Sequence, residues 1–151
     1  MHGLHKFLDV GSINIEMISL CSGGFSILHA GHIDYLEGAR QYGQVVIALN
    51  SDAWLKRKYG FVVMPWSERA RILKSLIVVY DVIRVQDDDG TVCEAIRSIQ
   101  PNYFVNGGDR TEPEPREHVA CVSLGVIEIF RAGGKKVNSS SNIIREIKNW
   151  S

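Results

Sequence analysis

The chain has 151 residues, which suits one domain that can bury a sizeable hydrophobic core. It is 45% hydrophobic, and its 17 basic residues balance 17 acidic ones, so no net charge favours general binding to nucleic acid or to anionic membranes. It also lacks a run of about 20 apolar residues that could span a membrane, and its start does not read as a secretory signal peptide. We therefore expect a soluble protein that recognises its partners through local sites, with no nucleic-acid or membrane partner.

The cysteine pattern indicates the cellular compartment in which we expect the protein. Cys21, Cys93 and Cys121 are odd in number, widely spaced and without a Cys-x-x-Cys pair, so they predict neither a disulfide framework nor a metal site. A reducing cytoplasm is the simplest location. Residues 1–15 show only weak periodicity, and we expect a loosely held extension of a single domain that covers residues 1–151.

Short apolar runs alternate with amphipathic segments along the chain. Residues 17–23 and 44–50 predict buried strands, and residues 32–43 predict a helix that ends at Gly43 as the glycine following its last turn. Ser67 is predicted to cap the next helix. In chain order, the remaining expected elements are a helix over 67–77, a strand over 80–85, a helix over 91–99, a strand over 102–108, a helix over 115–125, a strand over 126–130 and a serine-capped helix over 139–150.

This alternation predicts an α/β fold: a Rossmann-like three-layer α/β/α domain with a mainly five-stranded parallel sheet. In such sheets ligands bind beyond the carboxyl ends of the strands, where the strand order reverses. Four loops rich in glycine, hydroxyl or charged residues follow predicted strands, and we expect them to converge on one crevice: residues 22–32, 50–58, 106–115 and 131–141.

The first of these loops has the features of a polyphosphate site. Gly23 and Gly24 follow the first strand, where a missing Cβ permits a tight turn and a close approach of backbone amides to phosphate. His29 and His32 flank Gly31 at the start of a helix, whose N-terminal amides and dipole attract anions. Two imidazoles there can donate hydrogen bonds to a phosphoryl group.

The phrases GGFSILHAGHIDYLEGAR, LNSDAWLKRK, VNGGDR and SSSNIIREI resemble the cytidylyltransferase-like nucleotidyltransferase family, most of all its heptose-phosphate adenylyltransferase and glycerol-3-phosphate cytidylyltransferase branch. The resemblance covers about residues 19–149. It implies transfer of AMP or CMP from ATP or CTP to a phosphorylated sugar or polyol of the heptose 1-phosphate or glycerol 3-phosphate type. The acceptor attacks the α-phosphorus in line, pyrophosphate leaves, and no covalent intermediate forms. The resemblance further implies Mg²⁺ bound with the triphosphate, and a homodimer.

The resemblance also implies residue roles. His29 and His32 would hold the triphosphate, and Lys56 would contact the α-phosphate and the acceptor phosphate, with Lys58 as the alternative. Asp52 is expected to cap a helix, and residues 86–90, with three consecutive aspartates, to form a solvated helix start rather than a magnesium site. The further nucleotide-binding residues that the resemblance implies are Gly23, Gly24, Phe25, Gly31, Arg69, Gly107, Asp109, Ser139, Ser140 and Ser141.

Several alternatives stay open on the sequence. Gly134 stands where cytidylyltransferases of this branch often have arginine. The sequence therefore favours adenine over cytosine as the base of the nucleotide, without excluding cytosine. Arg110 has no assigned role. A pantetheine-phosphate or nicotinamide-mononucleotide adenylyltransferase is a rival within the superfamily, and a non-catalytic nucleotide-binding regulator is a rival from another class. A dinucleotide-dependent dehydrogenase is disfavoured because no Gly-x-Gly-x-x-Gly motif is present.

Overall fold

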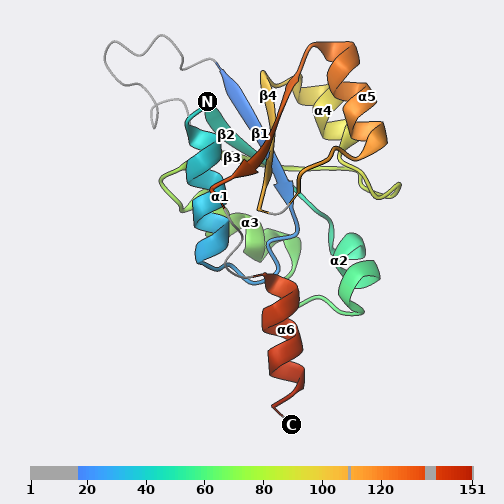
Figure 1. Ribbon diagram of the computed structural model, residues 1–151. Helices are drawn as coiled ribbons and strands as arrows, with labels where there is room; N and C mark the ends of the chain where they lie inside the picture. Colours follow the sequence, from blue (N-terminus) through green and yellow to red (C-terminus); the bar gives the residue numbers. More distant parts are fainter. Residues whose placement is uncertain (1–16, 109, 135–138, 151) are drawn as a thin grey trace.

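A five-stranded parallel sheet organises the protein, in a computed structural model that describes residues 17–108, 110–134 and 139–150 (Figure 1). The strand order is β3-β2-β1-β4-β5, and every neighbouring pair is parallel. The predicted Rossmann-like α/β fold is thereby confirmed. The strands are β1 (Ile18–Gly23), β2 (Gln44–Leu49), β3 (Val79–Arg84), β4 (Tyr103–Gly107) and β5 (Ile127–Ala132).

Helices cover both faces of the sheet, as Figure 1 shows. Alternate residues of β1 explain the two layers, because successive side chains of a strand point to opposite faces. Cys21 packs in a core with residues of α1 and α3, whereas Leu20 packs in a second core with residues of α4 and α5. The helices are α1 (Ala30–Arg40), α2 (Asp52–Tyr59), α3 (Trp66–Lys74), α4 (Cys93–Ile99), α5 (Pro115–Leu124) and α6 (Ser140–Lys148).

Two predicted helix boundaries are wrong. Helix α1 ends at Arg40 with Gln41 as its C-cap, so Gly43 does not terminate it. Gly43 is instead required by close packing, since a Cβ there would stand 2.7 Å from the carbonyl oxygen of Met17. Helix α3 begins after Pro65, and Ser67 lies inside its first turn. Pro65 has the extended conformation of an N-cap, with φ −65° and ψ 162°, and its lack of an N–H group costs nothing before the first turn.

Helix α2 lies within a segment that the sequence treats as a loop. Its N-cap is Ser51, whose hydroxyl accepts a hydrogen bond from the Trp54 amide, and Gly60 closes it in the left-handed conformation. Asp52, expected as the cap, is the first helical residue. The segment has few apolar residues, so it carries little of the periodicity that reveals a helix. Its only buried residue is Leu55.

Strand order reverses between β1 and β4, which lie next to each other at the centre of the sheet. The chain leaves β1 toward β2 and β3 on one side and reaches β5 on the other. The loops after β1 and β4 therefore diverge and leave a crevice at the carboxyl ends of these strands. Helix α6 extends beyond this end of the sheet (Figure 1). Every helix in the described part of the chain is too short or too polar to cross a membrane.

Candidate active site

A cavity of about 370 Å³ occupies the crevice at the carboxyl ends of β1 and β4. This volume lies within the usual range of small-molecule sites. All four loops singled out in the sequence contribute to its wall, through residues such as Gly23 and His32, Asn50 and Lys58, Asn106 and Arg110, and Gly134 and Ser140. The expected convergence of the loops is therefore observed. Gly24, Phe25, His29, Gly31, Gly107, Ser139 and Ser141 also line the cavity.

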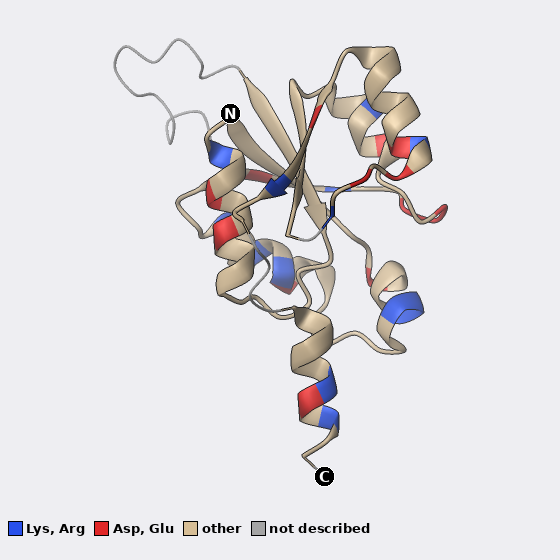
Figure 2. Ribbon diagram, in the orientation of Figure 1, with Lys and Arg blue, Asp and Glu red and all other residues tan. Residues whose placement is uncertain are grey.

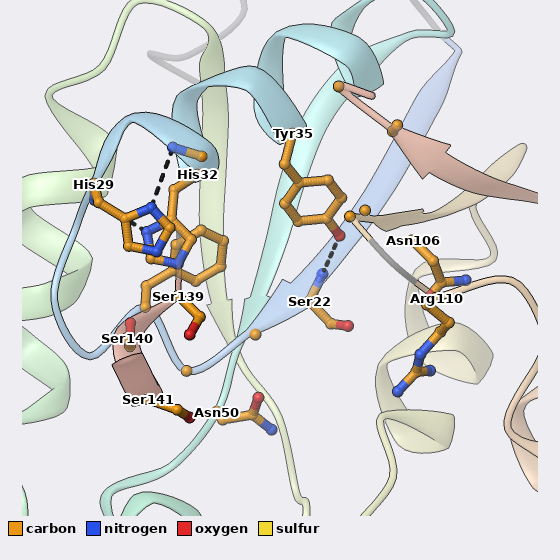
Figure 3. A pocket seen from close by; sticks show the side chains of 18 of the residues that line it. Ser22, His29, His32, Tyr35, Asn50, Asn106, Arg110, Ser139, Ser140 and Ser141 are labelled. Atoms are coloured by element: carbon orange, nitrogen blue, oxygen red, sulfur yellow. Dashed lines mark hydrogen bonds between the residues drawn. The ribbon is translucent and has the colours of Figure 1, made fainter. Parts of the chain in front are cut away.

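His29 and His32 form a stacked pair at the start of α1 (Figure 3), with ring centroids 3.8 Å apart and planes inclined at 26°. His29 is the N-cap: its Nδ1 accepts a hydrogen bond from the Gly31 amide at 3.1 Å. The Nδ1 of His32 accepts one from the His29 amide at 3.2 Å. Because an accepting Nδ1 carries no proton, the neutral form of each ring carries its proton on Nε2. The backbone thus fixes both tautomers as Nε2 donors.

Phe25 supports this pair from the loop after β1. Its ring is buried and lies 4.7 Å, centroid to centroid, from the His32 ring. Its backbone has φ 47°, a left-handed conformation that costs energy for a residue with a large side chain. Gly24 precedes it, where a Cβ would stand 2.8 Å from Leu55 Cδ2. The glycine-bearing turn is therefore packed tightly under α2.

The three serines at the start of α6 have different contacts. Ser139 is the N-cap and accepts a hydrogen bond from the Asn142 amide at 3.0 Å. Ser140 is buried, and its hydroxyl donates to the Ile27 carbonyl at 3.2 Å and so ties α6 to the first loop. Ser141 is bonded to the Tyr59 hydroxyl of α2 at 3.4 Å. The helix N-terminus, with its positive dipole end, is thus anchored beside the histidine pair (Figure 3).

Helix α2 presents one of its two lysines to the cavity. Lys58 lines the cavity, with its Nζ 4.9 Å from the Trp54 ring centroid, whereas Lys56 is not among the lining residues. Two residues advance a helix by about 200°, so Lys56 and Lys58 face opposite ways. Trp54 and Lys58, four residues apart, share a face. The structure therefore favours Lys58, the alternative in the sequence analysis, over Lys56; the basic last turn of α2 stands out in Figure 2.

Arg69 does not line the cavity, contrary to its expected place at a phosphate. Its side chain is fully buried, and its guanidinium donates to the backbone carbonyls of Gly24, Asn50 and Met64 at 2.7 to 2.9 Å. A fourth contact, at 2.6 Å, joins it to the Asp52 carboxylate. These contacts use its donors within the protein, and they hold together the loops that follow β1 and β2.

Asp87, within the acidic segment expected to be solvated, is buried and organises the start of α2. Its carboxylate accepts hydrogen bonds from the Asn50 side chain at 3.0 Å, the Ser51 amide at 2.8 Å and the Ser51 hydroxyl at 2.7 Å. Its carbonyl accepts from Arg57 at 2.9 Å. Asn50 and Lys58 reach the cavity from the segment that Asp87 holds. Sequence reasoning missed this role because the partners of Asp87 lie about 36 residues away.

The end of β4 and the loop that follows it contribute to the cavity wall next to α1. Gly107 lies over the Tyr35 ring, where a Cβ would be only 2.6 Å from a ring carbon, so glycine is required there. The Tyr35 hydroxyl donates to the Val105 carbonyl at 2.6 Å and accepts from the Ser22 amide at 3.1 Å, which pins β1 to β4. Burial raises the pKa of Tyr35 well above its usual value, so the phenol stays protonated. Asp109, predicted to contact the nucleotide, lies outside the described residues, as do residues 1–15.

The cysteines are not placed for nucleophilic chemistry. All three are buried as free thiols, and burial raises the pKa of Cys21 and of Cys121 to about 12. A thiol with such a pKa is protonated at neutral pH and is a weak nucleophile. Within residues 17–108, 110–134 and 139–150, no three His, Cys, Asp or Glu side chains gather as metal ligands. The cavity wall combines imidazole, hydroxyl, ammonium and guanidinium donors, which suit an anion, with the carboxylates of Asp34 and Glu117.

Three known proteins are similar to this chain in sequence or in fold. The chain is 38% identical over 144 residues to the bifunctional protein HldE of Photorhabdus laumondii and 37% identical to that of Yersinia enterocolitica. Each alignment covers 89% of this chain and 28% of the relative, so the chain spans little more than a quarter of their length. A lipopolysaccharide core biosynthesis protein from Thermoplasma volcanium shares the fold, with a TM-score of 0.68 at 22% identity over 81% of this chain and 98% of that one.

A family model also matches most of the chain. The cytidylyltransferase-like model matches residues 20–147, from the first strand to the last helix, and so includes the histidine pair and all four loops. The chain therefore belongs to the cytidylyltransferase-like family, and it is a nucleotidyltransferase.

Proposed function

We propose that this nucleotidyltransferase transfers AMP or CMP from a nucleoside triphosphate to a phosphorylated sugar or polyol and releases pyrophosphate. The observation that carries the proposal is the pair His29 and His32, whose Nδ1 atoms are bonded to the backbone so that Nε2 is the donor of each neutral ring. Beside this pair lies the N-terminus of α6, itself an anion-binding feature. The acceptor class follows the resemblance of the sequence to the heptose-phosphate adenylyltransferase and glycerol-3-phosphate cytidylyltransferase branch.

The reaction needs no nucleophilic side chain. An oxygen of the acceptor phosphate attacks the α-phosphorus, a new phosphorus–oxygen bond forms, and the bond to the departing pyrophosphate breaks with its electron pair. Negative charge builds on the α-phosphate oxygens and on the leaving group. His29, His32 and Lys58 are the donors proposed to stabilise this charge, since fixed donors lower the barrier most when they already point at the charge that develops.

Mg²⁺ is proposed to enter together with the triphosphate. Most of the groups that the histidine loop and α6 bring to the cavity are donors: imidazoles, the serine hydroxyls of 139–141 and the N-terminal amides of α6, with Asp34 of α1 as a carboxylate among them. They suit phosphate oxygens, which would in turn hold the cation along with water. When bound, the ion supplies partial neutralisation of the triphosphate charge. The homodimer and the cytoplasmic location stay predictions.

Pyrophosphate release tests the proposal. The protein is assayed with Mg²⁺ and either ATP or CTP against glycerol 3-phosphate, hexose 1-phosphates and heptose 1-phosphates. We expect release that requires one triphosphate and one acceptor together. Release with pantetheine phosphate or nicotinamide mononucleotide, and none with sugar or polyol phosphates, would contradict the acceptor class. Nucleotide binding by calorimetry without any release would favour a regulator.

The two lysines of α2 give a matched comparison. Lys58→Ala is expected to lower kcat/KM at least tenfold more than Lys56→Ala, because only Lys58 lines the cavity. An interaction between a side-chain ammonium and a phosphate that strengthens in the transition state is worth roughly 1.4 kcal/mol or more, which is tenfold in rate. Steady-state kinetics of both variants measure the difference. A larger loss in Lys56→Ala would restore the assignment that the sequence favours.

A further inference from the structure

The end of the cavity away from the histidines holds a polar cluster that the proposed reaction does not yet use. It consists of Asn106 at the end of β4, Arg110 in the loop that follows, and Glu117 in α5, and all three line the cavity. Figure 3 shows Asn106 and Arg110 on the other side of Ser22 from His29 and His32. We refer to Asn106, Arg110 and Glu117 as the β4 cluster.

Asn106 indicates that this end is built for a ligand. The residue is only 6% exposed, and its side-chain nitrogen Nδ2 has no hydrogen-bond partner among the described residues. A buried donor left without a partner loses its hydrogen bonds to water without replacement, so native proteins rarely keep one without a reason. Because Asn106 lines the cavity, an acceptor atom of a bound molecule can satisfy Nδ2.

Arg110 supplies charge to the same end. Among the described residues that line the cavity, Lys58 and Arg110 are the only permanently charged cations, and they come from different loops. One guanidinium nitrogen of Arg110 is 3.4 Å from Glu117 Oε1, and its side chain is 47% exposed. That single long contact leaves most of the five guanidinium donors for a ligand. A planar guanidinium binds phosphate oxygens in pairs, which also sets orientation.

Glu117 holds the Arg110 side chain in place. Its carboxylate is buried and accepts a hydrogen bond from the Val92 amide at 3.0 Å, so it is held between α4 and α5. Burial raises its pKa, although the Val92 amide and Arg110 oppose the rise. A carboxylate held in this way limits the directions that the Arg110 guanidinium can take. The cluster therefore combines one oriented cation with one unsatisfied amide donor.

We propose that the β4 cluster is the acceptor subsite, in which Arg110 binds the phosphate of a phosphorylated polyol or sugar and Asn106 Nδ2 donates to one of its hydroxyl oxygens. The inference rests on the proposed function and names the residues that select its second substrate. A two-substrate reaction requires both phosphates to meet in one cavity, and Lys58 from α2 and Arg110 from the loop after β4 would give each phosphate its own cation. The acceptor hydroxyls then lie toward β4, away from the triphosphate.

Direct binding tests this assignment without relying on turnover. Calorimetry measures the binding of glycerol 3-phosphate and of a hexose 1-phosphate to the protein saturated with a non-hydrolysable ATP or CTP analogue. The variants are Arg110→Gln and Asn106→Leu, and the matched control is Arg97→Gln, an exposed arginine of α4 outside the cavity. Inorganic phosphate is added as a competitor. Thermal unfolding of each variant is recorded alongside.

We expect acceptor affinity to fall at least tenfold in Arg110→Gln and Asn106→Leu, with nucleotide affinity changed less than twofold and Arg97→Gln like the unaltered protein. Competition by inorganic phosphate should weaken in Arg110→Gln but not in Asn106→Leu. The Tm of Asn106→Leu should stay unchanged or rise, since an apolar side chain of similar size removes an unsatisfied buried donor. A Tm that falls together with acceptor and nucleotide affinity would show a structural role only and overturn the inference.

Two further outcomes separate this inference from the proposed function. If the unaltered protein binds acceptor and releases pyrophosphate while both variants bind acceptor as tightly, the subsite is wrong and the function stands. If the variants lose nucleotide affinity instead, the β4 cluster serves the nucleotide and the inference is also wrong. If the unaltered protein neither binds a polyol or sugar phosphate nor releases pyrophosphate with one, both proposals fail.

Discussion

Replacing His29 or His32 with alanine is expected to lower turnover by two or more orders of magnitude. Each ring is fixed by a backbone hydrogen bond to Nδ1, which makes Nε2 the donor of the neutral ring, and both residues line the cavity. A pre-oriented donor to charge that develops in a transition state is worth about 3 kcal/mol, or about 100-fold in rate. Pyrophosphate release at saturating substrates measures the effect.

His29 has a second role that the experiment must separate. As the N-cap of α1, it stabilises the helix, and alanine at an N-cap costs about 1 kcal/mol. His29→Asn keeps a good capping residue but removes Nε2, so we expect a nearly unchanged Tm together with the loss of turnover. His118→Ala, which alters an exposed histidine of α5 outside the cavity, is the control. Normal turnover in both His29→Asn and His32→Ala would contradict the proposed site.

Arg69→Met is expected to lower the free energy of unfolding by about 3 kcal/mol. The substitution removes donors from three backbone carbonyls and leaves Asp52 without its ion-pair partner. For a domain of this size the loss corresponds to a fall in Tm of roughly 6 to 12 °C. Urea denaturation and thermal unfolding measure it. Methionine retains much of the buried apolar stem, so the change reports mainly on the guanidinium.

Arg71→Gln is the matched control on the same helix. Arg71 is exposed, and a surface substitution of this kind usually changes stability by less than about 0.5 kcal/mol. The opposite pattern would support the predicted phosphate-binding role of Arg69. In that pattern, Arg69→Met has the stability of the unaltered protein but binds the triphosphate poorly. Comparison of the two variants therefore decides between a structural arginine and a substrate-binding one.

The parts of the site that are local in sequence were the predictable ones. His29 and His32 are three residues apart at a helix start, and Ser139 precedes another helix, so their geometry follows from helix periodicity and capping. Arg69 and Asp87 were different. Each is charged and was expected to face phosphate or solvent, yet each is buried because distant groups satisfy it: backbone carbonyls and Asp52 for Arg69, and Asn50 and Ser51 for Asp87. Contacts of this kind leave no periodic signal in the sequence.

Which of Lys56 and Lys58 faces the cavity is a second feature that could not be predicted from the sequence. The sequence places Lys56 and Lys58 in one basic run and does not reveal α2, so it does not say which lysine faces inward. In the structure, Ser51 and Gly60 cap the two ends of a helix. Side chains that are two residues apart on that helix point in nearly opposite directions. Asn106 is a further example, since it becomes informative only when its side-chain nitrogen is seen to be buried without a partner.

The alternation of strands and helices, the parallel sheet and the loop that carries His29 and His32 could be predicted from the sequence, because they depend on short-range periodicity and turn chemistry. Only the folded chain shows which charged side chains reach the cavity, such as Lys58 and Arg110, and which are used inside the protein, such as Arg69 and Asp87. A buried charge must be matched by hydrogen-bonding partners, and in this fold those partners come from segments far apart in the chain.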